Sequence, residues 1–257
     1  MISKMAVLGS PIEHSLSPLI HNKAMEILGI SGSYQRFTVT EKDLAVFLKE
    51  HDEPEWQGFS LTMPLKEEGF RLGISSDEAT KKTQVSNTLV NSPKGWLAYN
   101  TDALGFEFLL KDQVYKSVSV LGTGGTARAA LFAISKDVEF VEVYRRSSKN
   151  DQICLDINSK IVFRDWQELS DSFRNDLLIN ATAASANDEL KALGRQVPVA
   201  IDAVYAPWPP PLLQFQKNAT YFSGKDLLVA QALDQISLFH RQPIDKKVMF
   251  ESLRSFI

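Results

Sequence analysis

The 257-residue chain has little cysteine, no excess of positive charge and no long hydrophobic run. Its single cysteine, Cys154, cannot form an internal disulfide, so a reducing compartment fits the chain best. The hydrophobic run Met5 to Leu8 ends at Gly9 and is too short for a signal peptide or a membrane span. We therefore expect a cytoplasmic protein with no membrane partner.

The charges of the chain are nearly balanced. Its 28 Lys and Arg residues stand against 31 Asp and Glu residues, which gives a net charge of -3. Binding to nucleic acid or to an anionic membrane usually requires a basic surplus, so neither is expected. A small molecule is the expected partner, and the length allows one large domain or two domains of ordinary size.

Strand-like and helix-like patterns alternate along the chain, which is typical of an α/β protein with mainly parallel sheets. A first series of strands is predicted at Met5–Leu8, Tyr34–Val39, Gly58–Leu61 and Thr88–Val90. A second series, expected to form a separate sheet, is predicted at Val118–Leu121, Phe140–Val143, Leu177–Ile179 and Val199–Asp202.

Helices are predicted between and after these strands. The first begins at Pro18 with Ser17 as its N-cap and ends at Leu28 before Gly29. The others are predicted at 41–50, 103–110, 128–136, 226–239 and 245–256. Nothing in the local pattern shows on which domain the last two pack.

A glycine-rich loop follows the strand that ends at Leu121. It reads Gly122-Thr123-Gly124-Gly125-Thr126-Ala127, which satisfies G-x-G-x-x-G/A between a strand and a helix. Such glycines let backbone N–H groups approach a pyrophosphate, and the helix N-terminus adds partial positive charge. The loop therefore predicts a dinucleotide-binding Rossmann domain.

Basic residues follow the second strand of this unit, in Tyr144-Arg145-Arg146-Ser147-Ser148-Lys149. An NAD-binding protein usually has an acidic residue there, whereas arginine matches the 2'-phosphate of NADP. The pattern thus favours NADP, and the alternative is a solvated turn.

Three polar segments lie at strand ends in the first 102 residues: Gly9–Asn22, Ser60–Lys66, and Ser86–Thr88 together with Tyr99–Asp102. Each alone could be a helix cap or a turn. Because ligands collect at strand ends in open α/β sheets, the three together favour a site for a hydroxylated acid.

The chain resembles the shikimate dehydrogenase family nearly from end to end. The family pattern GxPxxHSxSPxxHN is met from Gly9 to Asn22, and NVTxPxK is met at Thr62, Pro64 and Lys66. Further segments that match are Ser86–Thr88, Tyr99–Phe106, the glycine loop, Asn180–Thr182, Asp202–Tyr205 with Pro207, and Gly224–Ala232.

The resemblance implies a two-domain enzyme that reduces 3-dehydroshikimate to shikimate with NADPH. It implies a substrate domain at residues 1–102, an NADP-binding Rossmann domain at 103–225, and C-terminal helices at 226–257 that return to the first domain. Lys66 would supply the proton for the developing alkoxide, and Asp102 would be paired with it.

The resemblance also implies the binding residues. Besides Lys66 and Asp102, the substrate would contact Ser15, Ser17, Thr62, Asn87, Tyr205 and Gln231. The cofactor would contact Gly122, Thr123, Gly124, Gly125, Thr126, Tyr144, Arg145, Arg146, Lys149, Ala203 and Gly224. No metal is expected, because His14 and His21 have no further ligand cluster near them in the sequence.

Two departures from the family pattern bear on the site. The family's first asparagine in NVT is Ser60 here, so one substrate contact is expected to be lost or bridged by water. The family's NRT segment is altered near Tyr144, whose ring is a candidate for stacking on adenine.

Two alternative functions stay open. One is a quinate/shikimate dehydrogenase that uses NAD, against which Ser17 and the two arginines after Val143 argue. The other is a catalytically silent protein that binds shikimate-like ligands, against which the presence of Lys66 and Asp102 argues. A monomer or a homodimer is expected.

Overall fold

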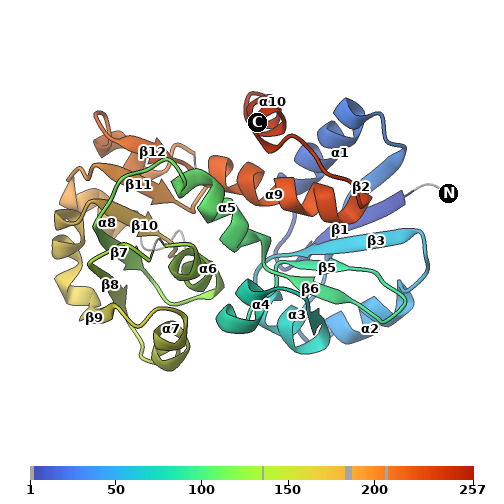
Figure 1. The fold of residues 1–257 in the computed structure, drawn as a ribbon, viewed down its shortest axis with the longest axis horizontal. Coiled ribbons are helices and arrows are strands. Elements are labelled where there is room, and N and C mark those ends of the chain that lie inside the picture. The colour runs from blue at the N-terminus through green and yellow to red at the C-terminus, as the bar shows by residue number, and fades with distance from the viewer. Residues whose placement is uncertain (1–2, 135, 183–186, 206–207) are drawn as a thin grey trace. The chain divides into compact units, whose positions relative to one another are not determined.

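The computed structural model describes residues 3–134, 136–182, 187–205 and 208–257. The chain divides into two compact units, of which unit 1 is Met1–Gly105 with Leu228–Ile257, and unit 2 is Phe106–Leu227. Each unit contains one six-stranded sheet (Figure 1). The two sheets correspond to the two predicted series of strands.

The sheet of unit 1 is mixed. Its strands, in chain order, are β1 (Ser3–Gly9), β2 (Gly32–Thr38), β3 (Trp56–Leu61), β4 (Ile74–Ser75), β5 (Thr88–Val90) and β6 (Leu97–Tyr99). Their order across the sheet is β2-β1-β3-β5-β6-β4. Strands β1, β2 and β3 pair in parallel, and β5 is antiparallel to both of its neighbours, β3 and β6. Strand β6 therefore runs in the same direction as β1 and β3.

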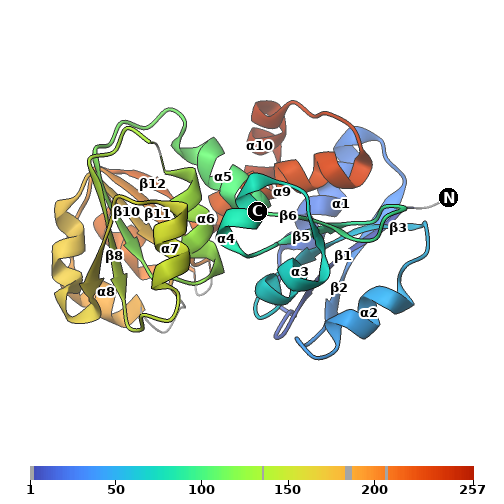
Figure 2. The ribbon, with the colours of Figure 1, turned by 60° about the horizontal axis from the view of Figure 1, so that its bottom comes forward.

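Helices cover both faces of this sheet. They are α1 (Ser17–Leu28), α2 (Leu44–Glu50), α3 (Lys66–Leu72), α4 (Glu78–Thr83), most of α9 (Gly224–His240) and α10 (Lys246–Arg254). Alternate residues of a strand point to opposite faces, so Met5 and Val7 of β1 pack in one cluster with Phe239 of α9. Ala6 and Leu8 pack in another cluster with Leu44 and Leu48 of α2. Figure 2 shows α2 and α3 on one side of the strands and α1 and α9 on the other.

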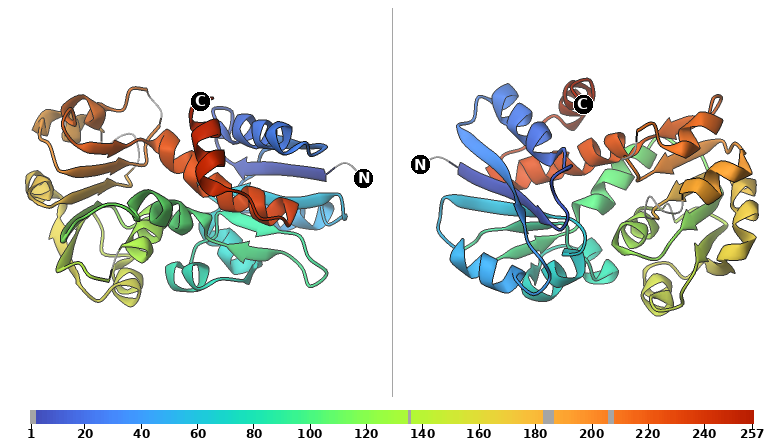
Figure 3. Two further views of the ribbon diagram at one scale, coloured as in Figure 1. Left: turned by 45° about the horizontal axis from the view of Figure 1, so that its top comes forward. Right: turned by 180° about the vertical axis from the view of Figure 1, so that it is seen from behind.

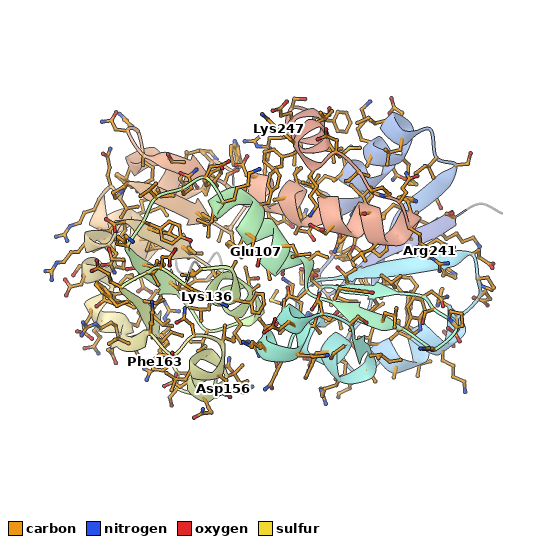
Figure 4. All side chains as sticks on the ribbon, in the orientation of Figure 1. Glu107, Lys136, Asp156, Phe163, Arg241 and Lys247 are labelled. Atoms are coloured by element: carbon orange, nitrogen blue, oxygen red, sulfur yellow. The ribbon has the colours of Figure 1, made fainter. Side chains whose placement is uncertain are left out.

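The two C-terminal helices pack within unit 1. A Cβ atom built on Gly58 of β3 would lie 2.3 Å from Cε1 of Phe239, so this glycine allows α9 to lie directly against the sheet. Arg241, which follows α9 (Figure 4), donates to the carbonyl of Asn91 at 3.3 Å. In both views of Figure 3, α10 lies beside α1.

The sheet of unit 2 is entirely parallel among the residues described. Its strands are β7 (Ser117–Leu121), β8 (Phe140–Arg145), β9 (Ile161–Asp165), β10 (Leu177–Asn180), β11 (Val199–Asp202) and β12 (Thr220–Phe222). Their order is β12-β11-β10-β7-β8-β9, with every neighbouring pair parallel. The chain thus reverses its direction of winding between β7 and β10, the place where open α/β sheets bind ligands.

Helices also flank the sheet of unit 2. They are α6 (Gly125–Ala133), α7 (Asp151–Ile157), α8 (Asn187–Leu193) and the 3₁₀ segments Trp166–Arg174 and Pro211–Phe215, while α5 (Thr101–Leu110) begins in unit 1 and ends in unit 2. Figure 2 shows α6 and α7 on one side of this sheet and α8 on the other. Leu121, Leu178 and Ala200 of the strands form a buried cluster with Leu190 of α8.

Several predicted boundaries need correction. Helix α6 begins at Gly125 inside the glycine loop, not at Arg128, because Gly124 already holds the extended conformation of an N-cap. The predicted end of this helix passes through residue 135, which lies outside the described residues. The predicted N-cap Ser17 is instead the first helical residue of α1, and Leu16 holds the cap position without a side-chain hydrogen bond. The short strands β4, β6 and β12 and the five-residue strand β9 were not predicted.

In the part of the chain that the structure describes, no helix combines the length and the apolar character needed to cross a membrane.

Candidate active site

The three polar segments of unit 1 meet at one edge of its sheet. Strands β1, β3 and β6 end at this edge and the antiparallel β5 begins there. Backbone hydrogen bonds join the segments: the N–H of Thr62 donates to Leu8 at 3.0 Å, and the N–H of Leu61 donates to Asn87 at 2.7 Å. The topology therefore gathers side chains that the sequence places up to 87 residues apart, from Ser15 to Asp102.

Gly9 permits the close approach of the first two segments. A Cβ atom at this position would lie 2.5 Å from Cγ2 of Thr62 and 2.9 Å from the carbonyl oxygen of Met63. The N–H of Ser10 also donates to Met63 at 3.0 Å. A larger residue at position 9 would push the loop of Ser15 and Ser17 away from Thr62.

Lys66 and Asp102 form an ion pair at this edge. Lys66 is the first residue of α3 and Asp102 lies in the first turn of α5. The ammonium Nζ of Lys66 donates to Oδ2 of Asp102 at 2.5 Å, and the two side chains are 20% and 10% exposed. A largely buried ammonium that a carboxylate holds in place can give a proton to an oxygen that gains negative charge.

Asn87 fixes the other oxygen of this carboxylate. Its amide Nδ2 donates to Oδ1 of Asp102 at 2.8 Å and to Oε1 of Gln231 at 3.1 Å. Its Oδ1 accepts from the N–H of Thr101 at 2.8 Å, which settles the orientation of the amide. Gln231 in turn donates to the carbonyl of Leu228 at 2.8 Å. Four of the sequence-predicted site residues therefore belong to one hydrogen-bonded group.

Ser15 and Ser17 lie at the start of α1. Oγ of Ser15 accepts from the N–H of Ser17 at 3.3 Å, Ser15 is half-buried, and Ser17 is almost fully buried. Two hydroxyl groups at a helix N-terminus favour an anionic ligand, since this end of a helix carries partial positive charge.

The two histidines of the first segment differ. His14 is exposed, whereas His21 is buried, and burial lowers the pKa of His21 to about 3. His21 is therefore neutral at physiological pH. Its Nε2 lies 3.1 Å from Oε1 of Gln235, and its ring stacks on Tyr34 with the centroids 4.1 Å apart.

Sequence reasoning missed Tyr34 and Gln235. Both are buried, and both bond to Ser60, whose Oγ accepts from the hydroxyl of Tyr34 at 2.6 Å and donates to Gln235 at 2.8 Å. A signal for Gln235 was available, because it follows Gln231 by four residues and so lies on the same face of a helix. No comparable local signal marked Tyr34.

In unit 2 the glycine loop turns sharply at its first residue. Gly122 has φ +100°, a left-handed conformation that favours glycine, and its N–H donates to Tyr144 at 2.9 Å. A Cβ atom on Gly124 would meet nothing within 4 Å. The loop therefore has open space over Gly124, beside the N-terminus of α6, where a phosphate could lie.

The basic residues after β8 are engaged with acidic partners. Arg145 forms a bidentate pair with Asp151 at 2.6 and 2.7 Å, which raises the pKa of the guanidinium, and it lies over the ring of Phe163. Arg146 donates to Glu189 at 2.6 Å and lies over the ring of Trp166. Lys149 is exposed. A 2'-phosphate would therefore have to compete with Glu189 for Arg146.

The structure contradicts the suggestion that Tyr144 stacks on adenine. Its side chain is 0% exposed, packs with Leu121 and Leu178, and donates from its hydroxyl to Glu142 at 3.0 Å. A ring enclosed by core residues has no free face for a base.

Gly224 brings two further predicted residues together. A Cβ atom on Gly224 would lie 2.8 Å from the carbonyl oxygen of Ala203 and 2.8 Å from the nitrogen of Tyr205. Burial raises the pKa of Tyr205, which therefore stays protonated. Pro207 of the same sequence segment lies outside the described residues.

No group of three or more His, Cys, Asp and Glu side chains that could hold a metal ion occurs within the described ranges.

A family model, curated relatives and solved structures that are similar to this chain all carry the name shikimate dehydrogenase. The family model described as shikimate dehydrogenase substrate binding domain matches residues 7–89. A protein of Helicobacter pylori named shikimate dehydrogenase (NADP(+)) is 31% identical, over 99% of this chain and 98% of that protein.

Solved structures give the same result. The crystal structure of Mycobacterium tuberculosis shikimate dehydrogenase is similar with a TM-score of 0.88 and 31% identity, over 98% of this chain and 99% of that one. A shikimate 5-dehydrogenase of Thermus thermophilus, solved in complex with NADP(H) and shikimate, has a TM-score of 0.84 and 28% identity over the whole of both chains.

Proposed function

This chain belongs to the shikimate dehydrogenase family, and we propose that it catalyses the reversible, NADPH-dependent reduction of 3-dehydroshikimate to shikimate. The observation that carries the proposal is the Lys66–Asp102 ion pair, held by Asn87 at the strand edge where Ser15 and Ser17 also lie. Unit 1 thus contains the proposed acid Lys66, the carboxylate of Asp102 that pairs with it, and the N-terminus of α1 as the proposed binding point for the substrate carboxylate.

Lys66 is the proposed proton donor to the substrate oxygen. When the ketone is reduced its oxygen becomes an alkoxide, which needs a proton from an acid within hydrogen-bond reach. Asp102 directs the ammonium through the hydrogen bond that joins them, and the amide of Asn87 holds the other carboxylate oxygen of Asp102 in place. In the reverse direction the neutral amine of Lys66 takes the proton back.

The remaining polar residues of the site are proposed to orient the substrate. Ser15 and Ser17 bind its carboxylate, and the substrate hydroxyls or carbonyl are bound by Thr62, Asn87, Tyr205 and Gln231. Neutral donors and acceptors suit a polyhydroxylated ring, because each can pair with a hydroxyl without introducing an unpaired buried charge. Residues 1–102 and the helices of 226–257 are the proposed substrate domain.

Residues 103–225 are the proposed cofactor domain, and their conformation fits NADP. The left-handed Gly122 and the open space over Gly124 suit a pyrophosphate at the start of α6, and Arg145, Arg146 and Lys149 supply positive charge for a 2'-phosphate. Thr123, Gly125 and Thr126 complete the loop, with Ala203 and Gly224 as further contacts. When bound, NADPH supplies the hydride that the chain's own side chains cannot.

Steady-state kinetics with two acids and two cofactors test the proposal. Shikimate and quinate are each offered with NADP and with NAD, and we expect the highest kcat/KM for shikimate with NADP. A higher value for quinate with NAD would support the alternative dehydrogenase. Tight binding of shikimate without turnover would support a silent binding protein, which the intact Lys66–Asp102 pair argues against.

We further propose that the protein acts in the cytoplasm as a monomer or a homodimer. Light scattering at the enzyme's working concentration separates the two states.

A further inference from the structure

Gln235 is a buried amide that joins helix α9 to other elements of unit 1. The residue is 1% exposed. Its Nε2 donates to Oγ1 of Thr88 at 2.9 Å and to the carbonyl of Asn87 at 3.2 Å. Because a backbone carbonyl can only accept, these bonds settle which end of the amide is the nitrogen. Gln235 thus holds the start of β5, the strand that follows Asn87.

The oxygen of the same amide accepts from two side chains. Oγ of Ser60 donates to Oε1 of Gln235 at 2.8 Å, and Nε2 of His21 lies 3.1 Å from this oxygen. Since an amide oxygen can only accept, the neutral ring of His21 carries its proton on Nε2. Every donor and acceptor position of the Gln235 amide is therefore used, and the amide cannot turn over without breaking these bonds.

Ser60 is held on its other side as well. Its Oγ accepts from the hydroxyl of Tyr34 at 2.6 Å, and the residue is 5% exposed. The one proton of Ser60 goes to Gln235, so this hydroxyl does not replace the contact expected of the family's asparagine. In this chain the amide that lies beside the end of β3 comes instead from α9.

A chain of hydrogen bonds runs from Gln235 to the candidate catalytic pair. Oγ1 of Thr88, which accepts from Gln235, gives its own proton to Oδ1 of Asn87 at 3.0 Å. The other end of that amide, Nδ2, donates to Oδ1 of Asp102 at 2.8 Å. The second oxygen of Asp102 accepts from the ammonium of Lys66. Gln235 and Lys66 therefore stand at the two ends of one hydrogen-bonded path.

We propose that Gln235 is a positioning residue for the acid Lys66. It acts without touching the substrate, through the hydroxyl of Thr88 and the amide of Asn87. A proton donor must lie within hydrogen-bond reach of the reacting oxygen, and a displacement of about 1 Å can lower turnover about 10²-fold. The proposal rests on the proposed function, since it takes Lys66 as the proton donor.

The variant Gln235→Met tests this. Methionine is close to glutamine in length and fills the same space, but it cannot donate to Thr88 or to the carbonyl of Asn87. We expect the kcat for shikimate oxidation with NADP to fall about 10-fold, because the acid loses part of its support. The KM for shikimate should change less than about threefold and the KM for NADP less than about twofold, since Gln235 binds neither.

Gln216→Met is the matched control. Gln216 is likewise buried, and its amide bonds to the backbone of Val197 and of Arg195 at 3.1 and 2.9 Å. Both variants should unfold at a lower urea concentration than the wild type, because each loses buried hydrogen bonds. Only Gln235→Met should lower kcat. An equal loss of kcat in the control would show that lost stability alone causes the effect, and the proposal would fail.

Two substitutions at Thr88 give a second test if Gln235→Met does not fold. Thr88→Ser keeps the hydroxyl that links the two amides, whereas Thr88→Val keeps the shape of the side chain and removes the hydroxyl. We expect Thr88→Val to lower kcat as Gln235→Met does, and Thr88→Ser to stay within about twofold of the wild type. Equal effects of serine and valine would mean that the hydroxyl is not part of the path, which overturns the proposal.

A double variant separates positioning from a general effect on the fold. In the Asp102→Asn background, Gln235→Met should lower kcat no further, because the group that it positions is already altered. If the two losses multiply, Gln235 does not act through Asp102 and the proposal is wrong. These negative results leave the proposed function intact, provided that the wild type oxidises shikimate with NADP. If the wild type oxidises neither acid with either cofactor, the proposed function and this inference fall together.

Discussion

At the scale of single residues, the proposed chemistry depends on the contact between Lys66 and Asp102. The residues next to each of them in the sequence do not mark it as catalytic. The proposed role of each depends on its ion pair with the other. The motif resemblance paired them, and the structure places their charged atoms 2.5 Å apart.

Replacing either partner should therefore affect turnover more than binding. We expect Lys66→Met and Asp102→Asn each to lower kcat by about 10²- to 10⁴-fold, the usual range for general acid–base catalysis, with a small change in KM. Lys82→Met is the control, since Lys82 forms a 3.2 Å pair with Glu78 in which both side chains of helix α4 are exposed to solvent. An equal loss of kcat in the control would indicate that the effect comes from lost charge alone.

Also at the residue scale, Glu189 should weaken the binding of NADP. It holds Arg146 at 2.6 Å in a pair whose side chains are about half exposed. Glu189→Gln removes the competing charge, so the KM for NADPH should fall about two- to fivefold, in keeping with the small energy of an exposed ion pair. The KM for NADH, which has no 2'-phosphate, should not change.

Asp171→Asn gives the matched control for this variant. Asp171 pairs with Arg174 at 3.0 Å on the surface of the same unit. If both variants lower the KM for NADPH equally, the effect is one of net charge and Arg146 has no special part in it.

At the scale of secondary-structure elements, helix α9 and helix α5 lie in direct backbone contact. A Cβ atom on Gly105 of α5 would lie 2.8 Å from the nitrogen of Gln231 and 3.1 Å from its Cα. This contact brings the Gln231 side chain to Asn87, 144 positions away in the sequence.

Gly105→Ala should push α9 away from α5. We expect the free energy of unfolding to fall by about 1–3 kcal/mol, the range for overpacking, and the KM for shikimate to rise because Gln231 moves from Asn87. Urea unfolding and steady-state kinetics measure the two effects. Glu107→Ala, at an exposed position on the same helix (Figure 4), should leave the KM for shikimate unchanged.

A comparison of the predicted and the observed strands and helices shows which features of the sequence are sufficient to locate an element. Strands with buried hydrophobic runs, such as Val118–Leu121, were predicted correctly, since their pattern is local. Short strands such as β6, with three residues, have no pattern of their own and form because a neighbour pairs with them. The N-cap assignment of Ser17 failed because the chain turns into α1 one residue earlier.

At the scale of the whole molecule, two buried titratable groups give the stability opposite dependences on pH. The pKa of His21 falls from 6.5 to about 3 and the pKa of Asp202 rises from 3.8 to about 6, in both cases chiefly through burial. Folding favours the neutral form of each. His21 therefore lowers the stability as pH falls below 6.5, and Asp202 lowers it as pH rises from about 4 to 6.

The variant His21→Phe should isolate the first effect. Between pH 6.5 and 5 the wild-type His21 must stay neutral in the fold while it gains a proton in the unfolded chain, which costs about 2 kcal/mol over this interval. We therefore expect the free energy of unfolding, measured in urea, to fall by about 2 kcal/mol more in the wild type than in His21→Phe when the pH is lowered from 6.5 to 5. Equal pH dependence in the two proteins would mean that His21 is protonated in the folded state.

The sequence by itself determined the α/β class, the glycine loop and the motif residues, because each depends on neighbours within a few positions or on a recognised pattern. Only the tertiary structure decided that Tyr34, Ser60 and Gln235 form one hydrogen-bonded network and that the ring of Tyr144 is enclosed. The physical reason is that a hydrogen bond between β2, β3 and α9 depends on which strands pair and where the helix returns. These are long-range contacts, which leave no periodic mark on the chain.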